Sequence, residues 1–83
     1  MRVYITCELD ETTGYITHLD PYDNLESAIN RAKVIIKSDT YIQDIEKRND
    51  YINQFEADAN KYLSVGFTYE DQLGLVRIIV KDM

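Results

Sequence analysis

The stretch from Asp39 to Tyr62 constrains the fold of this chain more than any other segment. It contains neither glycine nor proline, and apolar residues recur along it at spacings of three, four and seven. These apolar residues are Tyr41, Ile45, Ile52, Phe55 and Ala59. Such spacing forms one face of an α-helix, which at ~1.5 Å per residue would be roughly 36 Å long. We therefore predict one long helix, whose outer face carries Asp39, Gln43, Glu46, Asp50 and Gln54.

A shorter helix is predicted directly before it, starting at Asn24. Asp23 or Asn24 can cap its first turn, and Glu26 follows Asp23 at the spacing of a capping box. Its buried face is predicted to be Leu25, Ala28, Ile29, Ala32 and Ile36. Ser38 and Asp39 mark the break between the two helices, and a single kinked helix from Asn24 to Tyr62 is the alternative.

Two charged residues of the long helix lie close to its apolar face. Arg48 falls on the apolar stripe itself, four residues after Asp44, which predicts an ion pair between them on the helix surface. Glu56 also lies near the inner face, and no local partner for it is evident.

The two ends of the chain each read as a β-hairpin. Alternating apolar and polar residues predict strands at 2–9, 15–19, 63–69 and 75–81. The side chains expected to face the core are Val3, Ile5, Cys7 and Leu9 in the first strand, Leu63, Val65, Phe67 and Tyr69 in the third, and Val76, Ile78 and Val80 in the fourth. Each hairpin loop has the pattern acid-acid-x-x-Gly, ending in Gly14 and Gly74.

These elements predict an α+β fold in a single domain that covers residues 1–83. All apolar stripes are buried if both hairpins form one four-stranded antiparallel sheet and both helices cover one face of it, in the order ββααββ. Since the sheet uses the apolar stripe of the long helix, we expect a monomer or a weak dimer.

The charge balance restricts the class of partner. The formal net charge is -6 and the pI about 4.5, which disfavours direct binding to phosphate backbones and favours a basic protein. One cysteine allows no disulfide within the chain, which fits a reducing compartment. No signal peptide or membrane-spanning run is apparent. We expect a cytoplasmic protein, in the host cytoplasm if a phage encodes it.

Catalytic and cofactor motifs are not recognisable in the sequence. Cys7 is expected to be a small core residue, and His18 a surface residue beside Thr6 or Glu8. There is no calcium loop, no Cys/His spacing for zinc and no glycine-rich phosphate loop. We therefore expect no enzymatic activity, no metal and no cofactor.

Acidic and tyrosine side chains are the candidate binding residues. If the first helix runs back along the sheet, both hairpin loops lie at the same end, and their acids gather with the start of the long helix. Tyr41, Tyr62 and Tyr69 are expected in the core, and the remaining tyrosines are either core cover or interface anchors. The candidate partner-binding residues are Asp10, Glu11, Asp39, Glu46, Asp50, Glu70, Asp71, Tyr4, Tyr22 and Tyr51. The alternative is that the acids are ordinary solvated loop residues.

Two resemblances bear on function. A hairpin followed by a helix with Leu25, Glu26, Ala28 and Ala32 is similar to HicB-type antitoxin domains, which implies a regulatory or structural dimerisation module. The third strand of that family before the helix is missing here, and the long helix has no counterpart in it. In size and charge the chain also resembles phage anti-defence inhibitors, with no shared motif.

The leading hypothesis is a small acidic, non-catalytic binding protein. It would inhibit a basic, nucleic-acid-handling partner, such as a CRISPR or restriction nuclease, by occupying its nucleic-acid-binding surface. The alternative is an antitoxin-like dimer that associates through the long helix.

Overall fold

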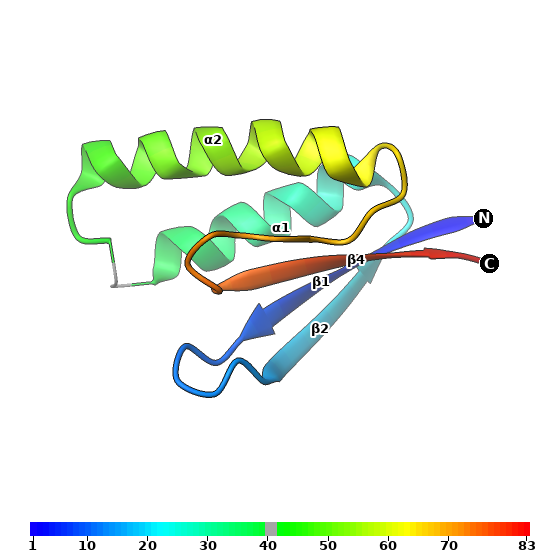
Figure 1. Ribbon diagram of the computed structural model, residues 1–83, viewed down its shortest axis with the longest axis horizontal. Coiled ribbons are helices and arrows are strands. Elements are labelled where there is room, and N and C mark those ends of the chain that lie inside the picture. Colours follow the sequence, from blue (N-terminus) through cyan, green and yellow to red (C-terminus); the bar gives the residue numbers. More distant parts are fainter. Residues whose placement is uncertain (40–41) are drawn as a thin grey trace.

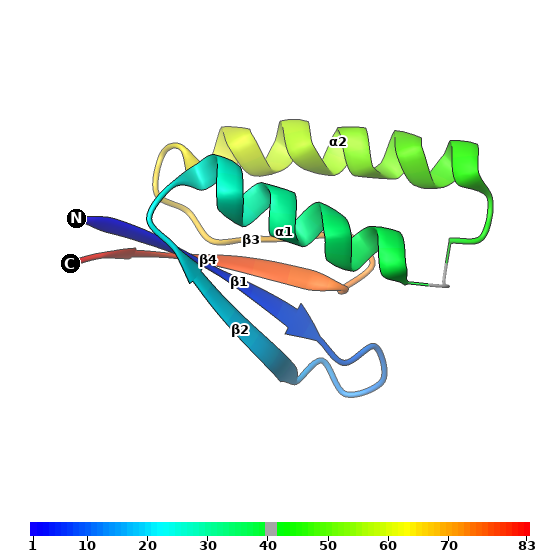
Figure 2. The ribbon, with the colours of Figure 1, turned by 180° about the vertical axis from the view of Figure 1, so that it is seen from behind.

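The computed structural model describes residues 1–39 and 42–83 and has the predicted order ββααββ. Figure 1 shows the two helices in one layer above the sheet, and the reverse view in Figure 2 shows the same arrangement. The elements are β1 (Arg2–Leu9), β2 (Ile16–Tyr22), α1 (Leu25–Ser38), α2 (Ile45–Leu63), β3 (Tyr69–Glu70) and β4 (Val76–Asp82). The α+β architecture predicted from the sequence is confirmed.

The four strands form one antiparallel sheet in the order β2-β1-β4-β3. The first and last strands of the chain are thus neighbours at its centre. β2 continues to Tyr22, beyond the predicted end at residue 19, and it contains Pro21. Proline lacks a backbone donor and is tolerated in edge strands, and β2 lies at an edge of the sheet.

The face of β1 that meets the helices is the opposite of the predicted one. The hydroxyl of Thr6 is buried and donates a hydrogen bond of 2.8 Å to the carbonyl oxygen of Ala28 in α1. Tyr4 packs against the same core as Val76 and Ile78 of β4. Since successive side chains of a strand alternate, Val3, Ile5 and Cys7 point to the face without helices. Cys7 is buried, as predicted, but on that other face.

The two helices are separate, which excludes the single kinked helix. α1 begins after Asn24, whose side chain accepts a hydrogen bond of 2.8 Å from the backbone N–H of Ser27. The predicted buried face of α1 is confirmed. The second helix begins at Ile45, later than the predicted Asp39, because Asp44 caps it through the N–H of Lys47. The predicted core position of Tyr41 lies outside the described residues.

Arg48 and Glu56, the two charged residues near the apolar face of α2, find their partners on α1. Because Asp44 serves as the cap, no ion pair joins it to Arg48 in the described chain. Arg48 instead donates to the carbonyl oxygen of Lys37 at the end of α1, at 3.1 Å. Glu56 forms an ion pair of 3.2 Å with Lys33 of α1, which accounts for its inward position.

The predicted strand at 63–69 is wrong for most of its length. Leu63 is buried as the last residue of α2, and β3 consists of Tyr69 and Glu70 alone. Gly66 has a φ of 90°, and backbone bonds run from Gly66 N–H to Leu63 and from Phe67 N–H to Tyr62. This is a Schellman motif, which ends a helix at a glycine in the left-handed region. Phe67 therefore lies at the surface, 63% exposed.

The turn between β3 and β4 is held by Asp71, a buried carboxylate that is only 4% exposed. It accepts hydrogen bonds from the N–H groups of Leu75 at 2.7 Å and Val76 at 2.8 Å. The Tyr51 hydroxyl of α2 also donates to it. Burial, and then the hydrogen bond to Asp71, raise the pKa of the Tyr51 phenol, so the donor stays protonated. This network fixes the second hairpin against α2.

We predict that Asp71→Ala lowers the free energy of unfolding by about 3 kcal/mol, because several buried donors lose a charged acceptor. Tyr51→Phe removes one of these bonds and is expected to cost about 1 kcal/mol. Urea unfolding monitored by circular dichroism measures both changes.

The matched control for Asp71→Ala is the neighbouring residue Glu70. Its carboxylate is partly exposed and pairs with Arg77 at 2.7 Å, so Glu70→Ala should change stability by no more than about 0.5 kcal/mol. Equal effects of the two alanine variants would contradict the structural role of Asp71.

Candidate functional site

An open groove lies between the first hairpin and the end of α1. The backbone N–H of Leu9 donates to the carbonyl oxygen of Leu75 at 3.0 Å, so both hairpin loops lie at the same end of the sheet, as expected. The groove has a volume of about 620 Å³ and is lined by Glu8, Leu9, Asp10, Glu11, Thr12, Thr17, His18, Ile35, Ser38, Asp39 and Leu75. Four of these are carboxylates, and none of the described lining residues is a lysine or arginine.

The hairpin loop itself places Asp10 at the groove. The Asp10 carboxylate accepts hydrogen bonds from the backbone N–H groups of Thr12 at 2.8 Å and Thr13 at 2.9 Å. Gly14, with a φ of 75°, lets the chain turn back so that its N–H reaches the Asp10 carbonyl oxygen. These backbone hydrogen bonds, from Thr13 first and then Thr12, lower the pKa of Asp10. Asp10 is therefore a stably ionised group with a local structural role.

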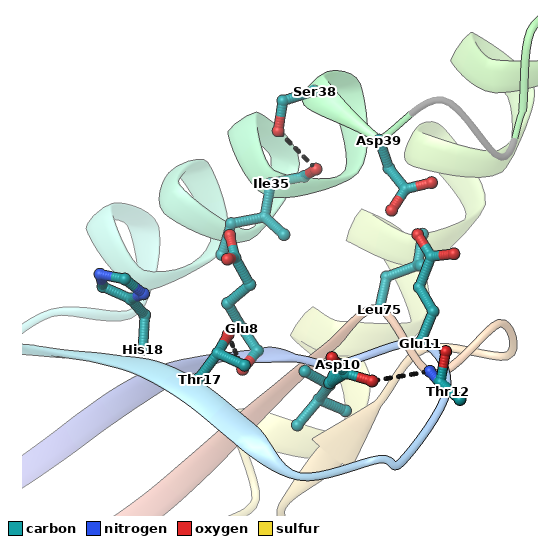
Figure 3. A pocket seen from close by; sticks show the side chains of 11 residues that line it. Glu8, Asp10, Glu11, Thr12, Thr17, His18, Ile35, Ser38, Asp39 and Leu75 are labelled. Carbon is teal, nitrogen blue, oxygen red and sulfur yellow. Dashed lines mark hydrogen bonds between the residues drawn. The ribbon is translucent and has the colours of Figure 1, made fainter.

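Glu11 and Asp39 approach each other across the groove from segments far apart in sequence. Figure 3 shows their carboxyl groups pointing toward one another, Glu11 from the hairpin loop and Asp39 from the end of α1. The pKa of Glu11 is raised, first by a hydrogen bond to Asp39, then by desolvation, and further by repulsion from Asp39 and Asp10. The raised pKa means that the fold favours a proton, or another positive charge, at this position.

Glu8 and His18 form the inner part of the groove. They are cross-strand partners in the register of β1 and β2, one of the two pairings predicted for His18. Figure 3 shows both side chains on the side of the sheet that faces α1. Glu8 was not among the predicted site residues, because the predicted core face of β1 was inverted. The expected position of His18 beside Glu8 on the neighbouring strand could have identified Glu8 from the sequence.

The remaining predicted acids do not join this groove. The Asp71 carboxylate is buried in the turn between β3 and β4, where it accepts backbone hydrogen bonds, and Glu70 pairs with Arg77 on β4. Glu46 and Asp50 are exposed on α2, a helix that contributes no residue to the lining of the groove. Of the expected acidic cluster, the structure thus brings together Asp10, Glu11 and Asp39, and it adds Glu8.

The tyrosines are distributed differently from the prediction. Tyr4, Tyr22 and Tyr51, the candidate anchors, are half-buried and pack against the core. Tyr62, expected in the core, is 43% exposed and stacks on Tyr69 with ring centroids 5.5 Å apart. Tyr15 is 75% exposed in the loop that bounds the groove, and its place beside Gly14 at the hairpin turn could have indicated this from sequence.

Within residues 1–39 and 42–83 no cluster of three or more His, Cys, Asp or Glu side chains has the geometry to hold a metal ion. Across the same residues, no helix is long and apolar enough to cross a membrane. Comparisons of the chain with protein-family models, with curated proteins and with solved structures returned no match.

We predict that Glu11→Gln stabilises the protein at pH 7. The folded-state pKa of Glu11 is raised above the ordinary value of 4.5, so its contribution to stability is present at low pH and is lost as the pH rises through the folded-state pKa. Glutamine keeps a hydrogen-bond donor for Asp39 without the charge. The urea midpoint of Glu11→Gln should exceed that of wild type at pH 7, and the difference should shrink as the pH falls toward 4.5.

Asp10→Ala provides a control with the opposite sign. The pKa of Asp10 is lowered from its ordinary value of 3.8, so its ionised form stabilises the fold above that pH and is lost as the pH falls. Asp10→Ala should therefore lower the midpoint at pH 7. Destabilisation by both substitutions at pH 7 would contradict the repulsion assigned to Glu11 and Asp39.

Proposed function

We propose that this chain is a non-catalytic inhibitor that binds a basic, nucleic-acid-handling protein through the acidic groove. The observation that carries the proposal is the convergence of Glu11 and Asp39, with Asp10 beside them, in a groove without a lysine or arginine among its described lining residues. Like charges gathered from separate segments weaken folding. A basic partner would offset the repulsion between these carboxylates, so the arrangement would be favourable in a complex.

Arginine and lysine side chains of the partner are the groups that such a groove would receive. An arginine guanidinium binds carboxylates through paired, charge-assisted hydrogen bonds, and Asp39 and Glu11 offer carboxylates from opposite walls. Tyr15 adds an exposed aromatic side chain at the rim, of the type enriched in binding hot spots. The long-range field of a chain with a net charge of -6 would also speed the encounter.

Inhibition follows from competition for one surface. The residues that a nuclease uses to hold phosphates are lysines and arginines, and a protein that neutralises them excludes the nucleic acid. A CRISPR or restriction nuclease is the concrete form of the target in this proposal. The alternative of a dimer formed through the long helix is less favoured, because Ile52, Phe55, Ala59 and Leu63 are already buried in the core.

We predict that the double variant Glu11→Lys/Asp39→Lys loses the partner while Glu46→Lys/Asp50→Lys keeps it. Both double variants change the net charge equally, so a difference between them reports the position of the contact. The tagged wild-type protein is first used to isolate the partner from a host lysate, and mass spectrometry identifies it. Binding of the purified partner is then measured at low and moderate salt, where an electrostatic contact should weaken as salt rises.

The inhibition is measured on the same purified partner. Wild-type protein should displace a labelled nucleic acid from it, and the groove variant should fail to do so at the same concentration. Circular dichroism verifies that each variant is folded. If the folded groove variant binds and displaces as well as wild type, the proposed function is refuted.

A further inference from the structure

β2 is the longer of the two edge strands of the sheet. It contains seven residues, whereas β3 at the opposite edge contains two. β2 pairs with β1 on one side, and no strand of the described chain pairs with its other side. Both views of the molecule show that side open (Figures 1 and 2). An edge strand of this kind presents a row of backbone N–H and C=O groups to which another strand can pair.

The strand registers identify which backbone groups of β2 point outward. The N–H of Leu9 in β1 donates to Leu75, on the β4 side of β1. Because the backbone groups of a central strand point alternately to its two neighbours, Cys7 also directs its N–H and C=O to β4. Leu19 lies opposite Cys7, so its own N–H and C=O point away from β1. The same holds for Pro21, which fits its lack of an N–H.

A strand added beside β2 would have two different faces. Residues opposite His18 and Asp20 would face the helices, because Asp20 pairs with Arg31 of α1 at 3.0 Å and His18 faces α1 (Figure 3). The added strand would lie ~4.8 Å from β2 and about 10 Å from β1. Facing arginine and glutamate side chains bridge such a distance, so a cation on this face reaches Glu8. Residues opposite Leu19, which is 58% exposed, would lie on the other face, beside an apolar side chain.

The charges beside this edge select a basic strand. The helix side of β2 leads into the acidic groove, whose described lining contains four carboxylates and neither lysine nor arginine. Arg31, which contacts β2 from α1, is already paired with Asp20. The β2 edge of a second copy would bring a second set of the same carboxylates to this place, which their repulsion disfavours. A segment with cations at every second residue complements both the edge and the groove.

We propose, on the basis of the inhibitory function proposed above, that a basic segment of the partner binds in extended conformation along β2 as a fifth strand of the sheet. Its cationic side chains alternate toward the groove, and the side chains between them lie beside Leu19. Main-chain hydrogen bonds then supply affinity, and the alternate side chains supply specificity. Pro21 offers no donor at the end of β2 far from the hairpin loop, so the added strand pairs at the end nearer the groove.

The probe is a nine-residue peptide in which arginine alternates with threonine, acetylated and amidated at its ends. Two further peptides carry N-methyl groups, one on its threonines and one on its arginines. Each methylated peptide keeps the charge and loses the N–H donors along one side of an extended chain. Only the peptide whose remaining donors face β2 can add to the sheet. For an antiparallel strand this is the peptide methylated on arginine, and for a parallel strand the peptide methylated on threonine.

Affinities are measured on the full chain by calorimetry at low salt. One methylated peptide should bind about as tightly as the unmodified one, and the other about tenfold or more weakly. In NMR, the unmodified peptide should protect the amide of Leu19 from hydrogen exchange. Equal affinities of the two methylated peptides, whether high or low, would overturn the proposal. Protection of Leu19 that appears in the free protein as its concentration rises would also overturn it, because it would indicate pairing between two copies.

The groove variant Glu11→Lys/Asp39→Lys separates this proposal from the proposed function. If the groove binds cations but no strand is added, the variant loses the unmodified peptide while the two methylated peptides bind wild type equally. If the groove does not bind cations, the folded variant binds the unmodified peptide as well as wild type does. Loss of the peptide by the variant, together with unequal binding of the methylated peptides to wild type, supports both.

Discussion

The pairing of β1 with β4 is the constraint on which the rest of this structure depends. It joins the first and last strands of the chain over seven residue pairs, from Arg2 and Asp82 to Glu8 and Val76. This pairing joins the two hairpins into one sheet, with both loops at the same end and one continuous face on which the helices pack. Because this contact spans nearly the whole sequence, the entropy of closing the intervening chain must be overcome before the sheet forms. The buried hydrogen bond from Thr6 to the carbonyl oxygen of Ala28 then connects this face of the sheet to α1.

Much of this architecture is predictable from the sequence, because it rests on local periodicity. The helical spacing before and after Ser38 and the alternation in β1, β2 and β4 are strong enough to place five of the six elements. The prediction fails where tertiary contacts decide between similar patterns. Val3 and Ile5 look more apolar than Tyr4 and Thr6, but a hydroxyl that reaches a helix carbonyl can be buried at little cost. At Gly66 a helix end competes with a strand, and the left-handed backbone of glycine favours the helix end.

The candidate site was only partly accessible from sequence for the same reason. The convergence of Asp10, Glu11 and Asp39 follows from the order of the elements, which periodicity gives. The inward turn of Asp71 depends on backbone N–H groups of Leu75 and Val76 that only the folded turn presents. A charged side chain requires either a partner or solvent, and the sequence alone does not determine which of the two the folded protein provides.

The groove of Glu8, Asp10, Glu11 and Asp39 is acidic, and a contact there would be weakened by salt.

NMR titration with a short arginine-rich peptide at low salt tests most directly where this protein accepts positive charge. The peptide can bind either at the groove or at the exposed acids Glu46 and Asp50 of α2. The account predicts that the largest amide shifts occur in β1 at Glu8, in the loop from Asp10 to Gly14, and at Asp39. Shifts confined to α2, or spread evenly over all acidic residues, would contradict it.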